Sequence, residues 1–225
     1  YAMRLAGLSY EQIAKNGGGI VSSVEGVRKS SKSQLIEKVK ERMNRFIAHG
    51  TTTIEAKSGY GLNTQSELKS LDVIGEVNKS HEIDMVPTFM GAHAFPKEFE
   101  LRRADYIQTI CDEMIPAVAK QGIAVFNDVF CEDGYFSVDE SRLILETGKK
   151  YGLKARLHAD EFSNSGAAAL AFEVDAFSAD HLMAVSNEGI SKLSKSNVVA
   201  TLLPGTTFFL GKNTYAPARK LLDAD

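Results

Sequence analysis

Two short segments of this sequence place ionisable side chains where an apolar run typical of a buried strand ends. They are Leu157-His158-Ala159-Asp160-Glu161 and Ser178-Ala179-Asp180-His181-Leu182. Imidazole binds a metal ion through a neutral ring nitrogen, and a carboxylate three positions further along can move a proton of metal-bound water without being a ligand itself. Enzymes built on parallel sheets keep their catalytic groups at such strand ends. The two segments therefore predict one shared pocket.

The contexts of the five histidines divide them into two groups. His49 ends a helical pattern and His81 follows a helix in a polar run, so we expect both at helix C-termini, where they satisfy carbonyl groups or the helix dipole. His93, His158 and His181 follow apolar, strand-like runs instead. These three are the candidate functional histidines.

The composition excludes several classes of protein. The chain is 44% hydrophobic and 24% charged with a formal net charge of −3, which describes an ordinary soluble surface around a large core. The sequence has no basic stripe with interleaved aromatic residues, so nucleic-acid binding is not predicted. No apolar stretch approaches the roughly 20 residues of a membrane span. No signal peptide opens the chain, so we expect a cytoplasmic location. Cys111 and Cys131 lack metal-type spacing and are predicted to be free thiols.

Hydrophobic periodicity predicts a regular alternation of short strands and amphipathic helices. The predicted strands are Thr51 to Ala56, Met85 to Met90, Ala124 to Phe130, Leu153 to Leu157, Val174 to Ser178 and Val198 to Leu203. The predicted helices are Gln34 to Ala48, Ser66 to Asn78, Asp105 to Lys120, Val138 to Lys149, Glu188 to Lys195 and Ala218 to Asp223. Ser137 with Glu140 predicts a helix start, and Gly50, Gly122 and Gly152 predict helix ends.

Strands that alternate with helices predict an α/β protein with a parallel sheet, either closed as a βα barrel or open and doubly wound. The polar residues that follow five of the predicted strands are Lys57 and Tyr60, His93, Cys131 and Glu132, His158 and Glu161, and Asp180 and His181. A doubly wound sheet concentrates its site at one switch point, whereas a barrel uses many strand ends. We therefore predict a (β/α)8-type barrel.

The predicted barrel is incomplete. An ideal barrel has eight βα units in about 250 residues, and the sequence from Tyr1 to Asp225 supplies about six. The chain also begins without a methionine and ends in a helical pattern. We interpret residues 1–225 as one partial catalytic domain, an interior piece that lacks the first and last barrel strands.

An ordered set of motifs closely resembles the imidazolonepropionase family over essentially the whole chain. The motifs are Tyr10 with Gly17-Gly18-Gly19-Ile20, Gly50-Thr51-Thr52-Thr53, Lys57-Ser58-Gly59-Tyr60-Gly61-Leu62, Phe89-Met90-Gly91-Ala92-His93, His158-Ala159-Asp160-Glu161, Ser178-Ala179-Asp180-His181 and Leu202-Leu203-Pro204-Gly205-Thr206-Thr207. The resemblance implies an amidohydrolase barrel of histidine degradation that uses water to open the ring of 4-imidazolone-5-propanoate and gives N-formimidoyl-L-glutamate.

The resemblance also implies a metal ion, zinc or iron. In the family the ion is held by a His-x-His pair on the first strand, a histidine on the fifth and an aspartate on the eighth. Only the fifth-strand histidine has a counterpart here, His158. The first-strand pair, the eighth-strand aspartate and a nearby substrate-binding arginine have none. With most ligands missing, we expect the 225-residue chain by itself to be inactive.

The remaining site residues come from the same resemblance. It makes Glu161 and His181 the catalytic acid/base pair, with Glu161 also in contact with the substrate, and it makes Tyr10, Tyr60 and His93 substrate contacts. We expect a small-molecule substrate and neither nucleic acid nor membrane as a partner, with a homodimer left open.

Elementary chemistry agrees with these roles. A bound divalent ion lowers the pKa of its water from about 15.7 to about 7, which supplies a nucleophile for amide hydrolysis. The metal or a protonated His181 would stabilise the oxyanion, and Glu161 would deliver a proton to the leaving ring nitrogen. For Asp180 we favour a structural role over an orienting one, because adjacent side chains on a strand face opposite ways.

Three alternatives stay open on the sequence alone. A related cyclic amidohydrolase or deaminase would keep His158, Glu161 and His181. A barrel aldolase would use Lys57, directly after a strand, to form a Schiff base. Because most metal ligands are missing, a non-catalytic binding module is the third.

Overall fold

The computed structural model describes residue 7 and residues 20–224, so Tyr10 and the glycine run at 17–19 lie outside the described residues. One parallel sheet organises the described part, with six strands in the order β1-β2-β3-β4-β5-β6. The strands are β1 (Thr53–Lys57), β2 (Asp84–Ala92), β3 (Phe126–Cys131), β4 (Lys154–Ala159), β5 (Ser178–His181) and β6 (Val199–Thr201). Neighbours in the sheet are neighbours in sequence, which confirms the predicted barrel type with about six βα units.

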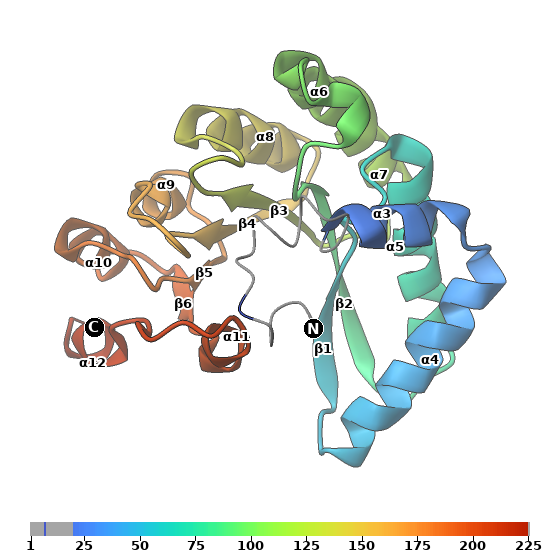
Figure 1. Ribbon diagram of the computed structural model, residues 1–225, viewed down its shortest axis with the longest axis horizontal. Coiled ribbons are helices and arrows are strands. Elements are labelled where there is room, and N and C mark those ends of the chain that lie inside the picture. The colour runs from blue at the N-terminus through green and yellow to red at the C-terminus, as the bar shows by residue number, and fades with distance from the viewer. Residues whose placement is uncertain (1–6, 8–19, 225) are drawn as a thin grey trace.

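Helices connect successive strands and lie along the outer side of the curled sheet, and further helices precede β1 and follow β6 (Figure 1). They are α3 (Ile20–Lys29), α4 (Lys32–Ala48), α5 (Thr64–Asn78), η1 (Lys97–Phe99), α6 (Arg103–Thr109), η2 (Ile110–Met114), α7 (Ile115–Gln121), α8 (Val138–Lys150), α9 (Ala167–Glu173), α10 (Asn187–Leu193), α11 (Pro204–Phe209) and α12 (Ala218–Asp223). None of the helices in the described ranges is long and apolar enough to cross a membrane.

Strand β4 shows how the sheet separates core from site. Ala155, Leu157 and Ala159 are buried members of the hydrophobic core between the sheet and the outer helices. Arg156 and His158 alternate with them and are less buried, so they lie on the inner, concave side. This period of two places the apolar residues against the helices and leaves the ionisable ones for the inner side.

Helix ends follow the predicted signals. Ser137 caps α8 and forms a capping box with Glu140, which satisfies two backbone N–H groups at the start of the helix. Gly122 ends α7 with φ of 69°, a left-handed conformation that glycine adopts without a steric penalty. His49 is the C-cap residue of α4, as predicted.

Two predicted elements differ in the structure. The predicted strand Val174 to Ser178 is wrong: β5 begins only at Ser178, because the preceding apolar run forms the short helix α9 and Val174 is its C-cap. The predicted single helix Asp105 to Lys120 is interrupted by the π-helical turn η2. Pro116 follows this turn and cannot donate an i→i−4 hydrogen bond, so the helix widens just before it.

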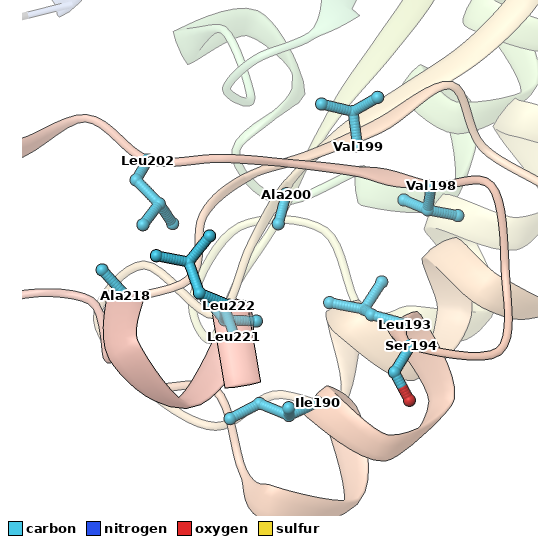
Figure 2. A pocket seen from close by; sticks show the side chains of 10 residues that line it. All are labelled: Ile190, Leu193, Ser194, Val198, Val199, Ala200, Leu202, Ala218, Leu221 and Leu222. Atoms are coloured by element: carbon cyan, nitrogen blue, oxygen red, sulfur yellow. The ribbon is translucent and has the colours of Figure 1, made fainter. Parts of the chain in front are cut away.

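An apolar groove of about 360 Å³ lies between β6, α10 and α12. Figure 2 shows the side chains that line it, among them Ile190 and Leu193 of α10 and Leu221 of α12. The groove includes none of the predicted site residues that the structure describes. The groove is therefore separate from the predicted site.

Candidate active site

His158 lies near the end of β4, where it pairs in register with Phe130 of β3 and Asp180 of β5. Its Nδ1 lies 3.1 Å from Oδ1 of Asp128, a fully buried carboxylate on β3. A carboxylate that accepts the Nδ1 proton fixes the orientation of the ring, so that the other ring nitrogen, Nε2, is left for a further binding partner. Burial alone would raise the pKa of Asp128, but His158 and the ammonium of Lys57 outweigh it and hold this pKa well below its ordinary value.

Lys57, the last residue of β1, lies among three carboxylates. Its ammonium donates a hydrogen bond to Asp128, and its Nζ is 3.1 Å from Glu55 and 3.6 Å from Asp180. Burial by itself would lower the pKa of Lys57, yet these carboxylates outweigh it and raise the pKa. A lysine that keeps its proton is a poor nucleophile, which argues against the Schiff-base alternative.

Asp180 completes this network on β5. It accepts a hydrogen bond of 2.8 Å from Ser178 Oγ, and its Oδ1 is 3.5 Å from the guanidinium of Arg156. Donor atoms of Asp128, His158 and Asp180 all lie within 4.8 Å of one another, the spacing of a cation site. Because the Lys57 ammonium contacts both carboxylates, positive charge is already supplied there by the protein.

Glu161 and His181 meet beside His158. Glu161 Oε2 lies 3.5 Å from His181 Nε2, and the His158 and His181 rings have centroids 5.1 Å apart. Burial raises the pKa of Glu161 to about 7. Burial and the neighbouring His158 lower the pKa of His181 to about 4. Near neutral pH the carboxyl group is therefore the better proton donor of the two, and His181 is a neutral imidazole.

The ends of β4 and β5 have left-handed backbone conformations. His181 has φ of 79° and Leu182 has φ of 57°, while Asp160 has φ of 48°. Such values cost about 1–3 kcal/mol for a residue other than glycine and persist where surrounding contacts enforce them. At β5 the turn breaks the strand alternation on which the expectation for Asp180 rested, because both Asp180 and His181 approach His158.

The side chain of Asp160, the residue before the candidate acid Glu161, binds the backbone at the start of α9. Its Oδ1 accepts hydrogen bonds of 3.1 Å from the N–H groups of Gly166 and Ala167, and its Oδ2 accepts one of 3.2 Å from Ala168. These are the N–H groups that the start of α9 leaves unpaired. The side chain of Asp160 therefore ties the loop that carries Glu161 to α9.

Tyr60 and His93 lie on the same rim, after β1 and β2. Their rings pack edge to face with centroids 4.9 Å apart, and the His93 centroid is 6.4 Å from that of His158. His93 Nδ1 lies 2.9 Å from the carbonyl oxygen of Gly59, so this nitrogen carries a proton and donates it there. Burial lowers the pKa of His93 to about 4, which leaves Nε2 as an acceptor.

The structure thus gathers five predicted site residues, Tyr60, His93, His158, Glu161 and His181, in one region. Asp128 was not predicted as a site residue. Its position in the middle of an apolar strand was a signal, because charged residues are almost never fully buried without a partner.

The two polar residues that were predicted to follow β3 have structural roles away from His158. Cys131 is buried among the core residues, and burial raises its pKa to about 11. Glu132 accepts hydrogen bonds from the Phe162 N–H, at 2.8 Å, and from the Ser163 hydroxyl. It therefore anchors the loop that carries Glu161 instead of joining His158.

Comparison with curated proteins finds close relatives along the whole chain. It is 47% identical over 224 residues to the imidazolonepropionase of Streptococcus gordonii, covering 100% of this chain and 53% of the relative. It is 49% identical over 224 residues to that of Geobacillus sp., with the same coverage of both. It is 48% identical over 222 residues to that of Treponema denticola, covering 99% of this chain and 54% of the relative. The chain spans about half the length of these relatives, and no family model matches it.

Two solved structures share the fold at low sequence identity. A mutant atrazine chlorohydrolase of Arthrobacter aurescens, in complex with zinc and atraton, has a TM-score of 0.70 at 14% identity over 96% of this chain and 52% of its own. An adenine deaminase of the same species has a TM-score of 0.62 at 11% identity over 86% of this chain and 60% of its own. At such identities the likeness establishes the barrel fold alone.

Proposed function

This chain belongs to the imidazolonepropionase family, and on that premise we propose that the protein uses water to open the ring of 4-imidazolone-5-propanoate, giving N-formimidoyl-L-glutamate. The observation that carries the proposal is the meeting of Glu161 and His181 beside His158. The three residues come from two neighbouring strand ends, where βα barrels keep their chemistry.

The described residues fit one metal ligand of the kind that the family implies. His158 donates its Nδ1 proton to Asp128, the arrangement that orients a metal-binding imidazole and leaves Nε2 for the ion. Lys57 already forms ion pairs with the two nearby carboxylates, Asp128 and Asp180. These two residues would therefore support the site without binding the metal ion themselves. A bound zinc or iron ion would supply an acidified water as the nucleophile.

The chain's own residues account for the proton transfers. A ring nitrogen that leaves as an amine needs a proton, and Glu161, whose pKa burial raises to about 7, holds one near neutral pH. His181 Nε2 lies 3.5 Å from Glu161, so we expect it to exchange a proton with Glu161 or to donate a hydrogen bond to the developing oxyanion. Tyr60 and His93, whose imidazole centroid lies 6.4 Å from that of His158, would hold the substrate.

His93 would contribute to substrate binding through one ring nitrogen only. Its Nδ1–H is already donated to Gly59, so it contributes an acceptor, Nε2, toward the substrate. We therefore expect His93 to accept a hydrogen bond from a substrate N–H instead of donating one to a carbonyl or carboxylate. An imidazolone ring offers such N–H groups, whereas a carboxylate does not.

The proposal is tested on the protein at the full length of its relatives. The purified enzyme should convert 4-imidazolone-5-propanoate to N-formimidoyl-L-glutamate, identified by mass spectrometry, and should contain about one zinc or iron ion. His158→Asn should lose metal and turnover together, whereas His49→Asn, at the C-cap of α4, should keep both. Deamination of adenine, or hydrolysis of another cyclic amide, in preference to imidazolonepropionate would contradict the assigned substrate.

A further inference from the structure

We propose that Glu67 and Arg28 are positioning residues that clamp the loop at residues 58–62 from both sides, and thereby set the Tyr60 and His93 side chains for substrate binding. The proposal rests on the function proposed above, because it takes Tyr60 and His93 as substrate contacts. Neither Glu67 nor Arg28 has been placed in contact with the substrate. Both act through the backbone of this loop.

Glu67 holds the N–H groups of the loop. Its side chain is fully buried in the first turn of α5. Oε1 accepts hydrogen bonds of 2.7 Å from Gly61 and 2.9 Å from Leu62, and Oε2 accepts one of 2.8 Å from Gly59. A buried carboxylate is unfavourable unless hydrogen bonds compensate it, and three N–H donors do so here.

Arg28 holds the carbonyl groups of the same loop. Its Nε donates to the Gly61 carbonyl at 2.7 Å, and a terminal nitrogen donates to the Leu62 carbonyl at 3.3 Å. The same terminal nitrogen lies 2.7 Å from Glu98, which directs the guanidinium. Because Arg28 belongs to α3 and Glu67 to α5, two helices grip the same two residues through opposite backbone groups.

The loop packs too closely against its neighbours to accept side chains at two of its glycines. A Cβ atom on Gly59, whose φ is +99°, would lie 2.8 Å from the Met90 carbonyl oxygen. A Cβ atom on Gly61 would lie 2.5 Å from Cβ of Ser66. Leu62, fully buried, has φ of 52°, a strained value for a leucine that persists where contacts over-determine it. The Glu67 and Arg28 hydrogen bonds are contacts of that kind.

The clamp reaches both substrate-binding side chains. The carbonyl of Gly59, whose own N–H is held by Glu67, accepts the Nδ1 proton of His93. Tyr60 lies between the clamped residues Gly59 and Gly61, and its ring packs against His93. Release of the loop would therefore misplace two substrate contacts at once while leaving His158, Glu161 and His181 in position. The expected signature is weaker substrate binding with the chemical step preserved.

The test uses the full-length enzyme and the variant Glu67→Gln, whose amide keeps the shape but sets an NH2 group against at least one backbone N–H. We expect KM for imidazolonepropionate to rise about tenfold or more, with kcat within about threefold and metal content unchanged. Glu76→Gln, an exposed glutamate on the same helix, is the matched control and should leave KM unchanged.

Substitutions of Arg28 test the proposal independently, in case Glu67→Gln folds poorly. Arg28→Gln should raise KM in the same selective way, and Arg28→Lys, which keeps the charge but not the forked donors, should lie between it and wild type. Unchanged KM in these variants, or an equal loss of kcat and metal, overturns the proposal.

A readout that needs no turnover separates this proposal from the proposed function. Histidine-selective ¹⁵N NMR should show a protected Nδ1 proton on His93 in the wild type and its loss in Glu67→Gln. If the wild type fails to turn over imidazolonepropionate while this NMR difference appears, the positioning stands and the assigned substrate falls. An identical His93 signal in both proteins overturns the positioning.

Discussion

Burial drives the pKa values of the two candidate proton-transfer groups in opposite directions. The raised pKa of Glu161, about 7, and the lowered pKa of His181, about 4, have the same first cause, because loss of water disfavours a negative carboxylate and a positive imidazolium alike. The result reverses their usual order and supports the proposed role of Glu161 as the acid. A protonated His181, which the sequence analysis considered for the oxyanion, is disfavoured in this environment.

Glu161 is predicted to transfer protons without binding metal. Glu161→Gln in the full-length protein should lower kcat by about 10² or more, because the amide cannot exchange a proton, while metal content stays near wild type. Steady-state kinetics and metal analysis check both. Glu146→Gln, an exposed glutamate on α8, is the control. Parallel loss of metal and activity would make Glu161 a ligand instead.

Tyr60 and His93 are predicted to bind the substrate. Tyr60→Phe removes a hydroxyl and His93→Phe removes an acceptor, and each change should weaken binding by about 1–3 kcal/mol. KM measured for imidazolonepropionate reports the loss. Tyr151→Phe, on an exposed ring at the end of α8, should have no effect. If both site variants matched wild type, the substrate would have to bind elsewhere on the rim.

At the scale of elements, the inner side of the sheet is held by charges contributed by separate strands. Glu55 and Lys57 come from β1, Asp128 from β3, Arg156 from β4 and Asp180 from β5. Glu55 also accepts a hydrogen bond of 2.6 Å from Thr88 of β2. The network therefore links five strands beneath the His158 imidazole.

Removal of the central cation should destabilise this network. Lys57→Met leaves Asp128, Asp180 and Glu55 as facing carboxylates without their ammonium, and the loss of one partner of a buried ion pair costs about 3–5 kcal/mol. Urea unfolding of the full-length protein measures it. Lys192→Met, which breaks an exposed pair with Glu173, should cost less than about 1 kcal/mol. Equal effects of the two substitutions would show that the inner network carries no special stability.

The sequence was sufficient to predict the elements that carry the site but not their local geometry. The apolar run before His158 places it at a strand end, because side-chain period is a local property. The strand predicted before His181 began too early, at Val174 instead of Ser178, because Val174 ends α9. The left-handed φ of His181 depends on contacts from other elements, and no local pattern marks it in a residue other than glycine. Glu67 was missed for a related reason, since its three partners lie in a loop whose conformation is set by packing.

At the scale of the molecule, the described strands form part of a barrel. Strands β1 and β6 each pair with a single neighbour within the described residues, and the curl between them is open in Figure 1. The inner face of a closed barrel is covered by the strands opposite. Here Lys57 keeps 24% and His158 keeps 16% of its side chain exposed. Water therefore reaches the inner face of the sheet. Ion pairs are stronger, and protons leak less to solvent, where water is excluded.

The isolated residues 1–225 are accordingly predicted to be inactive and to associate. One described imidazole, His158, cannot hold zinc or iron in a hydrolytic geometry, which needs three protein ligands and an open position. Among the residues that the structure describes, β1 and β6 each have an unpaired edge, which offers N–H and C=O groups to other chains. Compared with the full-length protein, this polypeptide should bind metal weakly, show no ring opening and elute as larger species in size-exclusion chromatography. A monomeric sample with stoichiometric metal and full turnover would mean that residues 1–225 themselves supply the missing ligands, and it would overturn the site built around His158.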